Sequence, residues 1–312
     1  MLSRRNVRIK VMQVLYSMNR DENLGLSEAM TQYRQSVNRS FELYLFYLWQ
    51  FVQAACYSRE DLARRNAKLL PTDEDRHFTA ILCDNPLSRS LLDNTELVKY
   101  IRAYHTEDKI DEDITRTLYS DFAKSEEYLQ YLGNKAAGEE EHTQILLQLY
   151  KVCTNSEVFN DRMEDFFPTW TDDKSLVVGS VKKTLKALPA PVDFLKEYIP
   201  PKETTQEFGE TLLEQVFKQD KELLELIEPA LKNWDADRVA IIDMILIKMA
   251  LIELMAFPTI PTKVTINEFV EISKMYSTDK SKDFINGILD RLMKKLQKEG
   301  KILKEGRGLI EE

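Results

Sequence analysis

Five cationic side chains occupy the first twenty residues, and no carboxylate accompanies them. They are Arg4, Arg5, Arg8, Lys10 and Arg20. These twenty residues sum to +5 and the other 292 to −14, so the net charge of −9 for the whole chain conceals a strong asymmetry. Guanidinium groups form paired hydrogen bonds to phosphate oxygens. The amino terminus therefore indicates a site for an anionic ligand such as a phosphate backbone.

Few other residues have the spacing that catalysis or metal binding needs. Glu74 with His77, and Glu139 with His142, share an E-x-x-H spacing that places two ligands on one helical face. Each pair follows a proline or glycine break, and no matching set of carboxylates accompanies it. The chain also lacks glycine-rich phosphate loops and nucleophile motifs. We expect no catalytic residues, no metal and no cofactor, although an active site built only from carboxylates stays open.

Helices must position the basic groups. Nine glycines and ten prolines make up only 19 of 312 residues, too few for the turns of a sandwich, a propeller or a glycine-rich nucleotide fold. Val7, Val11, Val14 and Met18 recur at helical spacing, and Ser3 precedes them as a predicted N-cap. Cations on the first turns oppose the helix dipole, so an anionic ligand explains them better than helix stability does. A solvated basic face or a leader-like tail is the alternative.

The whole chain is predicted to be helical, in two main sections. Residues 58–200 remain helical but are more polar than the segments around them. Prolines near residue 200 mark a boundary. We expect an amino-terminal helical subdomain over residues 1–200 and a carboxy-terminal bundle over residues 201–312.

Two helix starts and one buried helix are predicted in the carboxy-terminal section. Thr204 with Glu207, and Thr265 with Glu268, have the spacing of capping boxes. Residues 239–257 are mostly apolar, but charges interrupt them at intervals that leave no lipid-facing side. This segment is predicted to be a central helix of a bundle and not a membrane span.

The cysteines are predicted to be unpaired. Cys56, Cys83 and Cys153 form no C-x-x-C pair and no even framework. Together with the absence of a secretory h-region, this pattern favours a reducing compartment and a cytoplasmic protein.

Two stretches of the chain resemble one family. Ile266-Asn267-Glu268 and, further on, Phe284-Ile285-Asn286-Gly287-Ile288-Leu289-Asp290 are similar to the I-N-E and F-V-N-G-x-L-D motifs of the NusB family. The first helix agrees, since Arg4-Arg5-x-x-Arg8 leads to Gln13-Val14-Leu15-Tyr16, which is similar to the family's R-R-x-x-R and Q-x-L-Y pattern. The resemblance covers residues 205–293 and most of the first twenty residues.

The resemblance to the NusB family implies an all-α protein, a pair of helical bundles, that acts in transcription antitermination. It implies three partners: boxA-like RNA, the small-subunit ribosomal protein that acts as factor E, and the RNA polymerase elongation complex. No catalysis and no membrane contact are implied. Such a factor supports the transcription of ribosomal RNA.

By matching positions, the resemblance assigns RNA contacts to the first helix and to the start of the last one. The residues concerned are Arg4, Arg5, Arg8, Gln13, Tyr16, Lys280, Ser281, Lys282, Phe284 and Asn286. Asp243 matches a position near the ribosomal-protein partner. Cations suit phosphates, while aromatic, amide and hydroxyl groups suit unstacked bases. Burial is the alternative for Phe284 and Tyr16, and bracing of the nearby Gly287 is the alternative for Asn286.

The middle of the chain has no counterpart in compact members of the family. We expect residues 58–200 to add helices to the amino-terminal bundle, although a separate lobe is the alternative. Two other functions stay open: a protein-only helical adaptor that has lost RNA binding, and a relative of the NusB-like domain of ribosomal RNA methyltransferases. Only about twenty residues follow Leu292, so we do not expect the catalytic domain of those enzymes.

Overall fold

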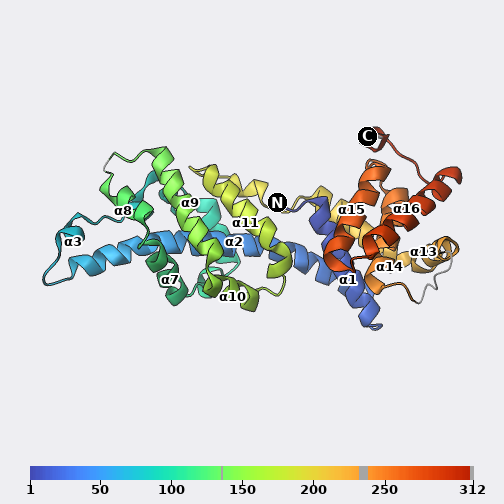
Figure 1. The fold of residues 1–312 in the computed structure, drawn as a ribbon, viewed down its shortest axis with the longest axis horizontal. Helices are drawn as coiled ribbons and strands as arrows, with labels where there is room; N and C mark the ends of the chain where they lie inside the picture. The colour runs from blue at the N-terminus through green and yellow to red at the C-terminus, as the bar shows by residue number, and fades with distance from the viewer. Residues whose placement is uncertain (135, 232–237, 310–312) are drawn as a thin grey trace. The chain divides into compact units, whose positions relative to one another are not determined.

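The computed structural model describes residues 1–134, 136–231 and 238–309. Every regular element in these ranges is a helix, which confirms the predicted all-α class with extra helices (Figure 1). Contacts divide the chain into two compact units. We call Leu2–Val37 with Pro200–Glu312 the terminal unit, and Asn38–Ile199, which Met1 joins, the inserted unit.

This division differs from the split expected at residue 200. The first helix packs with the carboxy-terminal section, and residues 38–199 form a unit of their own instead of covering an amino-terminal bundle. An apolar stripe shows that a helix is half-buried, but it does not identify the surface that covers it.

The terminal unit contains the helices near the two ends of the chain, before residue 38 and after residue 199. They are α1 (Arg4–Arg20), the first turns of α2 (Leu26–Asn66), η3 (Glu203–Glu210), α12 (Thr211–Lys218), α13 (Asp220–Ile227), η4 (Glu228–Ala230), α14 (Ile241–Ala256), α15 (Thr262–Tyr276), α16 (Ser281–Lys298) and η6 (Gly306–Leu309). In Figure 1 the blue α1 lies beside the orange and red α14 to α16, although more than 200 residues separate them in the chain.

Helix α14 is the centre of this unit. It packs against α1, α12, α13, α15 and α16, and it is apolar on nearly all sides. A helix that is hydrophobic all round needs neighbours on every side. The prediction of a central helix over residues 239–257 is therefore confirmed. None of the described helices combines the length and apolarity needed to cross a bilayer.

Local capping fixes the start of α1. Ser3 Oγ accepts a hydrogen bond from the Asn6 amide, and Asn6 Oδ1 accepts one from the Ser3 amide, which completes a capping box. The predicted N-cap is confirmed. The stripe of Val7, Val11 and Val14 is buried, so the first turn of α1 is held from both its cap and its apolar face.

The segment that enters the terminal unit after residue 200 is a π-helix, η3. The predicted capping box of Thr204 and Glu207 is wrong, because the helical turn begins earlier: the Thr204 and Thr205 amides both donate to the Pro201 carbonyl. Gly209 brings the η3 backbone against α1 and α2. A Cβ atom there would overlap with Tyr33 Oη and lie 2.6 Å from Val7 Cγ1.

The inserted unit is built on the longer part of α2, with the helices that follow it in the chain. These are α3 (Asp73–His77), α4 (Ile81–Asp84), α5 (Pro86–Leu92), α6 (Thr95–Ala103), η1 (Glu107–Lys109), α7 (Glu112–Phe122), α8 (Glu126–Gly133), α9 (Glu139–Asn155), α10 (Glu157–Phe166), α11 (Trp170–Lys186) and η2 (Phe194–Glu197). Buried aromatic residues of α2, including Tyr44, Phe46 and Tyr47, form its core with those of α10 and α11.

The expectation of three unpaired cysteines is wrong for two of them. Cys56 on α2 and Cys83 on α4 form a disulfide, because the packing of these helices brings their Cα atoms to 4.5 Å. Cys153 is free and buried.

We predict that Gly209→Ala destabilises the protein by about 1–3 kcal/mol, because the added methyl group has no room beside Tyr33 and Val7. Urea unfolding followed by circular dichroism measures this loss. Gly287→Ala is the matched control: it lies in α16 with no atom near the added Cβ, and we expect a gain of up to about 1 kcal/mol. A neutral Gly209→Ala would contradict the close approach of η3.

Candidate nucleic-acid interface

A buried ion pair holds the start of α1 against α14. Arg8 Nε and Nη2 donate to the two carboxylate oxygens of Glu253, each at 2.7 Å. The Arg8 side chain is 3% exposed and that of Glu253 is fully buried. The Arg8 guanidinium also lies over the rings of Phe208 and Phe269, at 5.3 and 5.7 Å from their centroids. All of its surroundings are therefore protein.

Helix α15 completes this network. Thr265 Oγ1 donates to Glu253 Oε1 at 2.8 Å, and Arg8 Nη1 donates to Glu268 Oε2 at 3.4 Å. The predicted capping box of Thr265 and Glu268 is wrong, because α15 begins one turn earlier, after Pro261, and both residues lie within it. Their side chains bind α14 and α1 instead.

Arg5 shares Glu268 with Arg8. Arg5 Nε and Nη2 donate to Glu268 Oε2 and Oε1 at 2.9 and 2.6 Å. These hydrogen bonds lower the pKa of Glu268 below its ordinary 4.5, against the opposing effect of partial burial, and the Arg8 charge adds to the lowering. The same contact raises the pKa of Arg5. Arg4 pairs with Glu203 at 3.2 Å, and about half of the Arg4 and Arg5 side chains stays exposed.

The three predicted arginines therefore have different environments. Arg4 and Arg5 reach solvent, whereas Arg8 does not. The expected RNA contact of Arg8 stays a prediction; in this structure its donors are used by two carboxylates inside the protein. The spacing of Arg8 from Arg4 puts both on one face of α1, one turn apart, and Arg8 is buried because Glu253 of α14 and Glu268 of α15 bind it there.

Arg4 and Arg5 open onto a groove of about 730 Å³, which we call the basic groove. It lies where α1 and α15 both begin. Its lining residues are Ser3, Arg4, Arg5, Arg8, Thr259, Ile260, Pro261, Lys263, Val264, Glu268 and Arg307. The amino-terminal ends of two helices and several cations thus face one hollow, an arrangement that suits anions.

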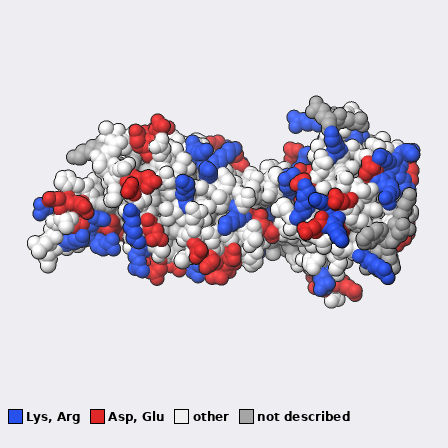
Figure 2. All heavy atoms as spheres, in the orientation of Figure 1, with Lys and Arg blue, Asp and Glu red and all other residues white. Residues whose placement is uncertain are grey.

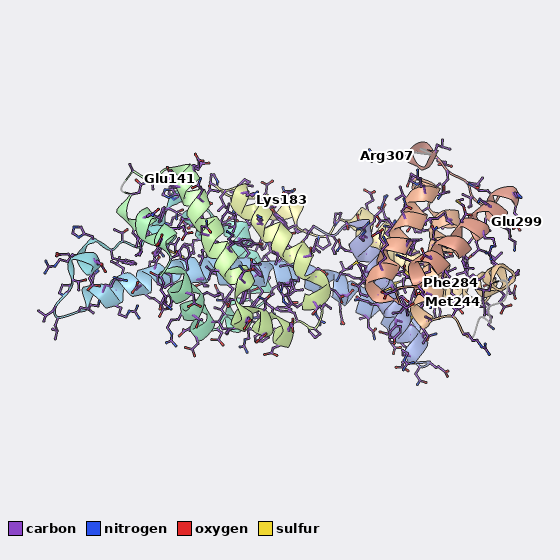
Figure 3. All side chains as sticks on the ribbon, in the orientation of Figure 1. Glu141, Lys183, Met244, Phe284, Glu299 and Arg307 are labelled. Atoms are coloured by element: carbon purple, nitrogen blue, oxygen red, sulfur yellow. A yellow bond between two sulfur atoms is a disulfide. The ribbon has the colours of Figure 1, made fainter. Side chains whose placement is uncertain are left out.

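Two cations of the basic groove were missed by sequence reasoning. Lys263 lies on the first turn of α15, and Arg307 lies on η6 near the end of the described chain (Figure 3). Both side chains are exposed, and neither forms an ion pair with a described residue. Only the tertiary fold brings them to Arg4 and Arg5, so no local spacing could have identified them.

A second groove, of about 490 Å³, adjoins the basic groove through Lys263. It is lined by Thr262, Lys263, Ile266, Asn267, Asn286, Asp290, Met293 and Gln297. Three of these residues carry amide side chains. Of the predicted residues at the last helix, the structure therefore brings Asn286 to the surface that carries the arginines. We call this hollow the amide groove.

The start of α16 is fixed from inside. Ser277 and Ser281 donate to Asp243 Oδ1 and Oδ2 at 2.6 and 2.7 Å. Asp243 and Ser281 are 5% and 2% exposed. The expected RNA contact of Ser281 and partner contact of Asp243 stay predictions; in this structure the two side chains bind each other inside the protein.

The remaining predicted residues lie on the surface or near it. Lys280 and Lys282 are exposed, and Phe284 is half-buried. Gln13 is half-buried, and Tyr16 is 38% exposed. Tyr16 follows Arg5 by eleven residues, about three helical turns, so the two side chains leave α1 on the same face.

Comparison with known proteins gives matches to one family. The model of the NusB family matches residues 181–294. The transcription antitermination protein NusB of Salinibacter ruber is 41% identical over 107 residues, which cover 34% of this chain and 67% of that protein. Proteins of the same name from Chloroherpeton thalassium and Natranaerobius thermophilus are 47% and 38% identical over 79 and 92 residues.

The chain spans 37% and 66% of the lengths of these last two relatives, and the matches cover 25% and 30% of this chain. No solved structure gives a significant match. The family match does not include α1. It is the packing of α1 on α14 and the shared groove with α15 that connect the basic helix to the matched region.

We predict that Glu253→Gln destabilises the protein by about 3–5 kcal/mol, because it leaves the Arg8 charge buried without its main partner. Urea unfolding measures the loss. Glu203→Gln is the matched control, since it removes the exposed partner of Arg4 and should change stability by less than about 1 kcal/mol. Equal effects of the two substitutions would refute the structural role of the buried pair.

A second prediction concerns pH. Since the folded-state pKa of Glu268 lies below 4.5, its ionised form stabilises the fold fully above about pH 4.5. This contribution is lost as the pH falls through the folded-state pKa. The free energy of unfolding, measured between pH 6 and 3, should therefore fall more steeply for the natural protein than for Glu268→Gln. Parallel pH profiles would show that Arg5 does not stabilise the carboxylate.

Proposed function

Because the chain belongs to the NusB family, we propose that it is an RNA-binding transcription antitermination factor that holds the phosphates of a boxA-like RNA in the basic groove. One observation supports this most: Arg4, Arg5, Lys263 and Arg307 come from three distant segments and converge where two helices begin. Cations and free amide groups at helix starts are the donors that phosphates need.

The amide groove supplies the second part of the proposed interface. Asn267, Asn286 and Gln297 carry both donors and acceptors, which unpaired bases require on their edges. Because Lys263 lines both grooves, a strand whose phosphates lie along the basic groove can turn its bases toward these amides. Tyr16, Lys280, Lys282 and Phe284 are proposed to extend the contact, while Arg8 and Ser281 are not part of it.

The chain has a net negative charge, and this limits how it binds RNA. On the face shown in Figure 2, acidic and basic groups alternate, so no uniformly basic surface is visible there. RNA affinity must then come from few local cations. Such binding is weak alone and falls with salt as phosphate contacts are screened.

We propose that the small-subunit ribosomal protein acting as factor E strengthens this binding, and that the complex joins elongating RNA polymerase in the cytoplasm to support transcription of ribosomal RNA. The protein itself is proposed to act as a binding factor and not as an enzyme.

A protein-only adaptor is the second candidate function. The ion pairs of Arg4 with Glu203 and of Arg5 with Glu268 favour it, because each carboxylate competes with a phosphate for the same guanidinium. RNA titration distinguishes the two functions.

We predict that replacing Lys263 and Arg307 together by glutamine weakens binding of a labelled boxA RNA about tenfold or more. Both side chains lack an ion pair with any described residue, so the fold should not change. Two lost phosphate contacts should also reduce the slope of log K against log salt by about 1.4. Fluorescence anisotropy at several salt concentrations measures both quantities.

Lys218→Gln with Lys221→Gln is the control, since it removes the same charge from an exposed site elsewhere in the terminal unit. It should weaken binding less than twofold. The titration is repeated with the ribosomal protein, which should increase affinity. Absence of RNA binding under both conditions would favour the adaptor.

A further inference from the structure

The segment after α16, residues 300–309, turns back onto the terminal unit, and we call it the tail (Figure 1). Gly300 ends α16 in the left-handed region, at a φ of 66°. Its amide donates to the Gln297 carbonyl at 3.1 Å, and the Lys301 amide donates to the Leu296 carbonyl at 2.9 Å. This pair of hydrogen bonds is a Schellman motif, which stops a helix and redirects the chain.

The tail docks on the loop between α14 and α15. The Glu305 amide donates to the Pro258 carbonyl at 3.0 Å, and Lys304 Nζ donates to the Phe257 carbonyl at 3.0 Å. Gly308 is buried against the same loop, where a Cβ atom would lie 1.9 Å from the Pro258 oxygen. A main-chain oxygen cannot rotate aside as a side chain can, so this contact requires glycine.

Arg307 lies between the two docked points of the tail. Glu305 precedes it and Gly308 follows it, and the Gly308 amide donates to the Glu305 carbonyl at 2.8 Å, which closes the turn. Among the described tail residues, Arg307 alone lines the basic groove. The docked contacts therefore fix the backbone from which the Arg307 side chain reaches that groove.

Docking of the tail depends little on apolar burial. Leu303 and Leu309 are 69% and 65% exposed. Lys304 is half-buried, and this burial lowers its pKa, against the opposing effect of the Glu253 charge. A segment with few buried apolar side chains opens at a low cost in free energy. A ligand that contacts only the docked state can shift such an equilibrium.

We propose that the tail is a strap whose docking positions Arg307 for an RNA phosphate, a role that rests on the RNA binding proposed for the basic groove. Gly308 is a positioning residue, because it acts through Arg307 and does not line the groove. Docking of the tail and binding of RNA then stabilise each other. Since such coupling is reciprocal, docking strengthens RNA binding by the same factor by which RNA favours docking.

Gly308→Ala tests the strap in anisotropy titrations of the full chain with a labelled boxA RNA. The added methyl group meets the Pro258 oxygen, so the tail stays open. We expect RNA affinity to fall about threefold or more, as for Arg307→Gln, and the slope of log K against log salt to fall by about 0.7, the value for one phosphate. A purely structural role would leave this slope unchanged.

The double variant separates positioning from a direct contact. When Arg307→Gln is already present, Gly308→Ala should cause no further loss of RNA affinity, because the group that it positions is gone. Additive losses would overturn the assignment of Gly308 to Arg307. Circular dichroism checks that each variant is folded.

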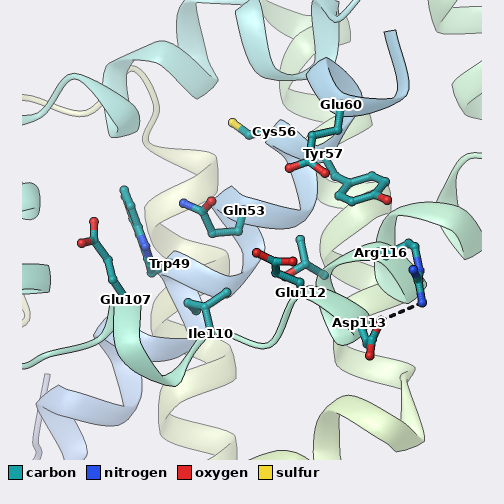
Figure 4. A pocket seen from close by; sticks show the side chains of 11 residues that line it. Trp49, Gln53, Cys56, Tyr57, Glu60, Glu107, Ile110, Glu112, Asp113 and Arg116 are labelled. Atoms are coloured by element: carbon teal, nitrogen blue, oxygen red, sulfur yellow. Dashed lines mark hydrogen bonds and ion pairs between the residues drawn. The ribbon is translucent and has the colours of Figure 1, made fainter. Parts of the chain in front are cut away.

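Two matched controls make the same chemical changes in the inserted unit. Gly179→Ala adds a methyl group to α11 with no atom near it. Arg116→Gln removes an exposed cation beside the hollow between α2 and α7, where Arg116 binds Asp113 at 2.7 Å (Figure 4). Each should change RNA affinity less than about twofold. An Arg116→Gln loss equal to that of Arg307→Gln would overturn the strap as general electrostatic attraction.

Hydrogen exchange of the natural protein measures the other side of the coupling and decides the question if Gly308→Ala does not fold. Saturating RNA should slow exchange of the Glu305 and Gly308 amides, by the factor that Gly308→Ala costs in RNA affinity. Arg307→Gln should keep the exchange rates of the free protein and lose the slowing by RNA. Exchange that RNA does not slow would overturn the coupling.

Failure of the strap and failure of the proposed function give different results. If the natural protein binds RNA and Gly308→Ala binds it equally well, the strap is wrong and the RNA-binding function stands. If the natural protein does not bind RNA, both are wrong.

Discussion

The buried pair of Arg8 and Glu253 is the constraint on which the terminal unit depends. Burying two charges costs several kcal/mol per ion, and the cost is offset only when geometry is close and every donor has an acceptor. Both conditions hold here, because Glu253 accepts from Arg8 and Thr265 while two aromatic rings cover the guanidinium. An apolar contact would tolerate rotation of α1, but this pair does not. It therefore fixes which faces of α1 and α15 border the basic groove.

One helix end thus uses the same residue type in two ways. Arg8 gives all of its donors to the interior, and this lets Arg4 and Arg5 remain at the surface in a defined position. Glu268 lies between the two environments, since it accepts from both Arg5 and Arg8. A phosphate that bound Arg5 would have to compete with that carboxylate, so in the proposed function one anion replaces another instead of filling an empty site.

Much of the fold was predictable from the sequence, and less of the site was. The scarcity of glycine and proline indicated helices, Ser3 gave the start of α1, and the apolar run after residue 239 gave the central helix. These are local signals. The capping spacings failed because Pro201 and Pro261 begin their helices earlier. Lys263 and Arg307 join the groove only through tertiary packing, and the burial of Ser281 and Asp243, to which matching by motif assigned contacts, is also a tertiary property.

The distance along the chain between Arg8 and Glu253 has a consequence for synthesis. The two residues are 245 positions apart, and the whole inserted unit lies between them. At about 5–20 residues per second, a ribosome needs about 12–50 s to make the second after the first. During that interval the inserted unit can fold, while α1 waits with its arginine hydrated and its apolar face uncovered. The terminal unit is thus the last part of the nascent chain to become native, and its basic groove does not exist before then.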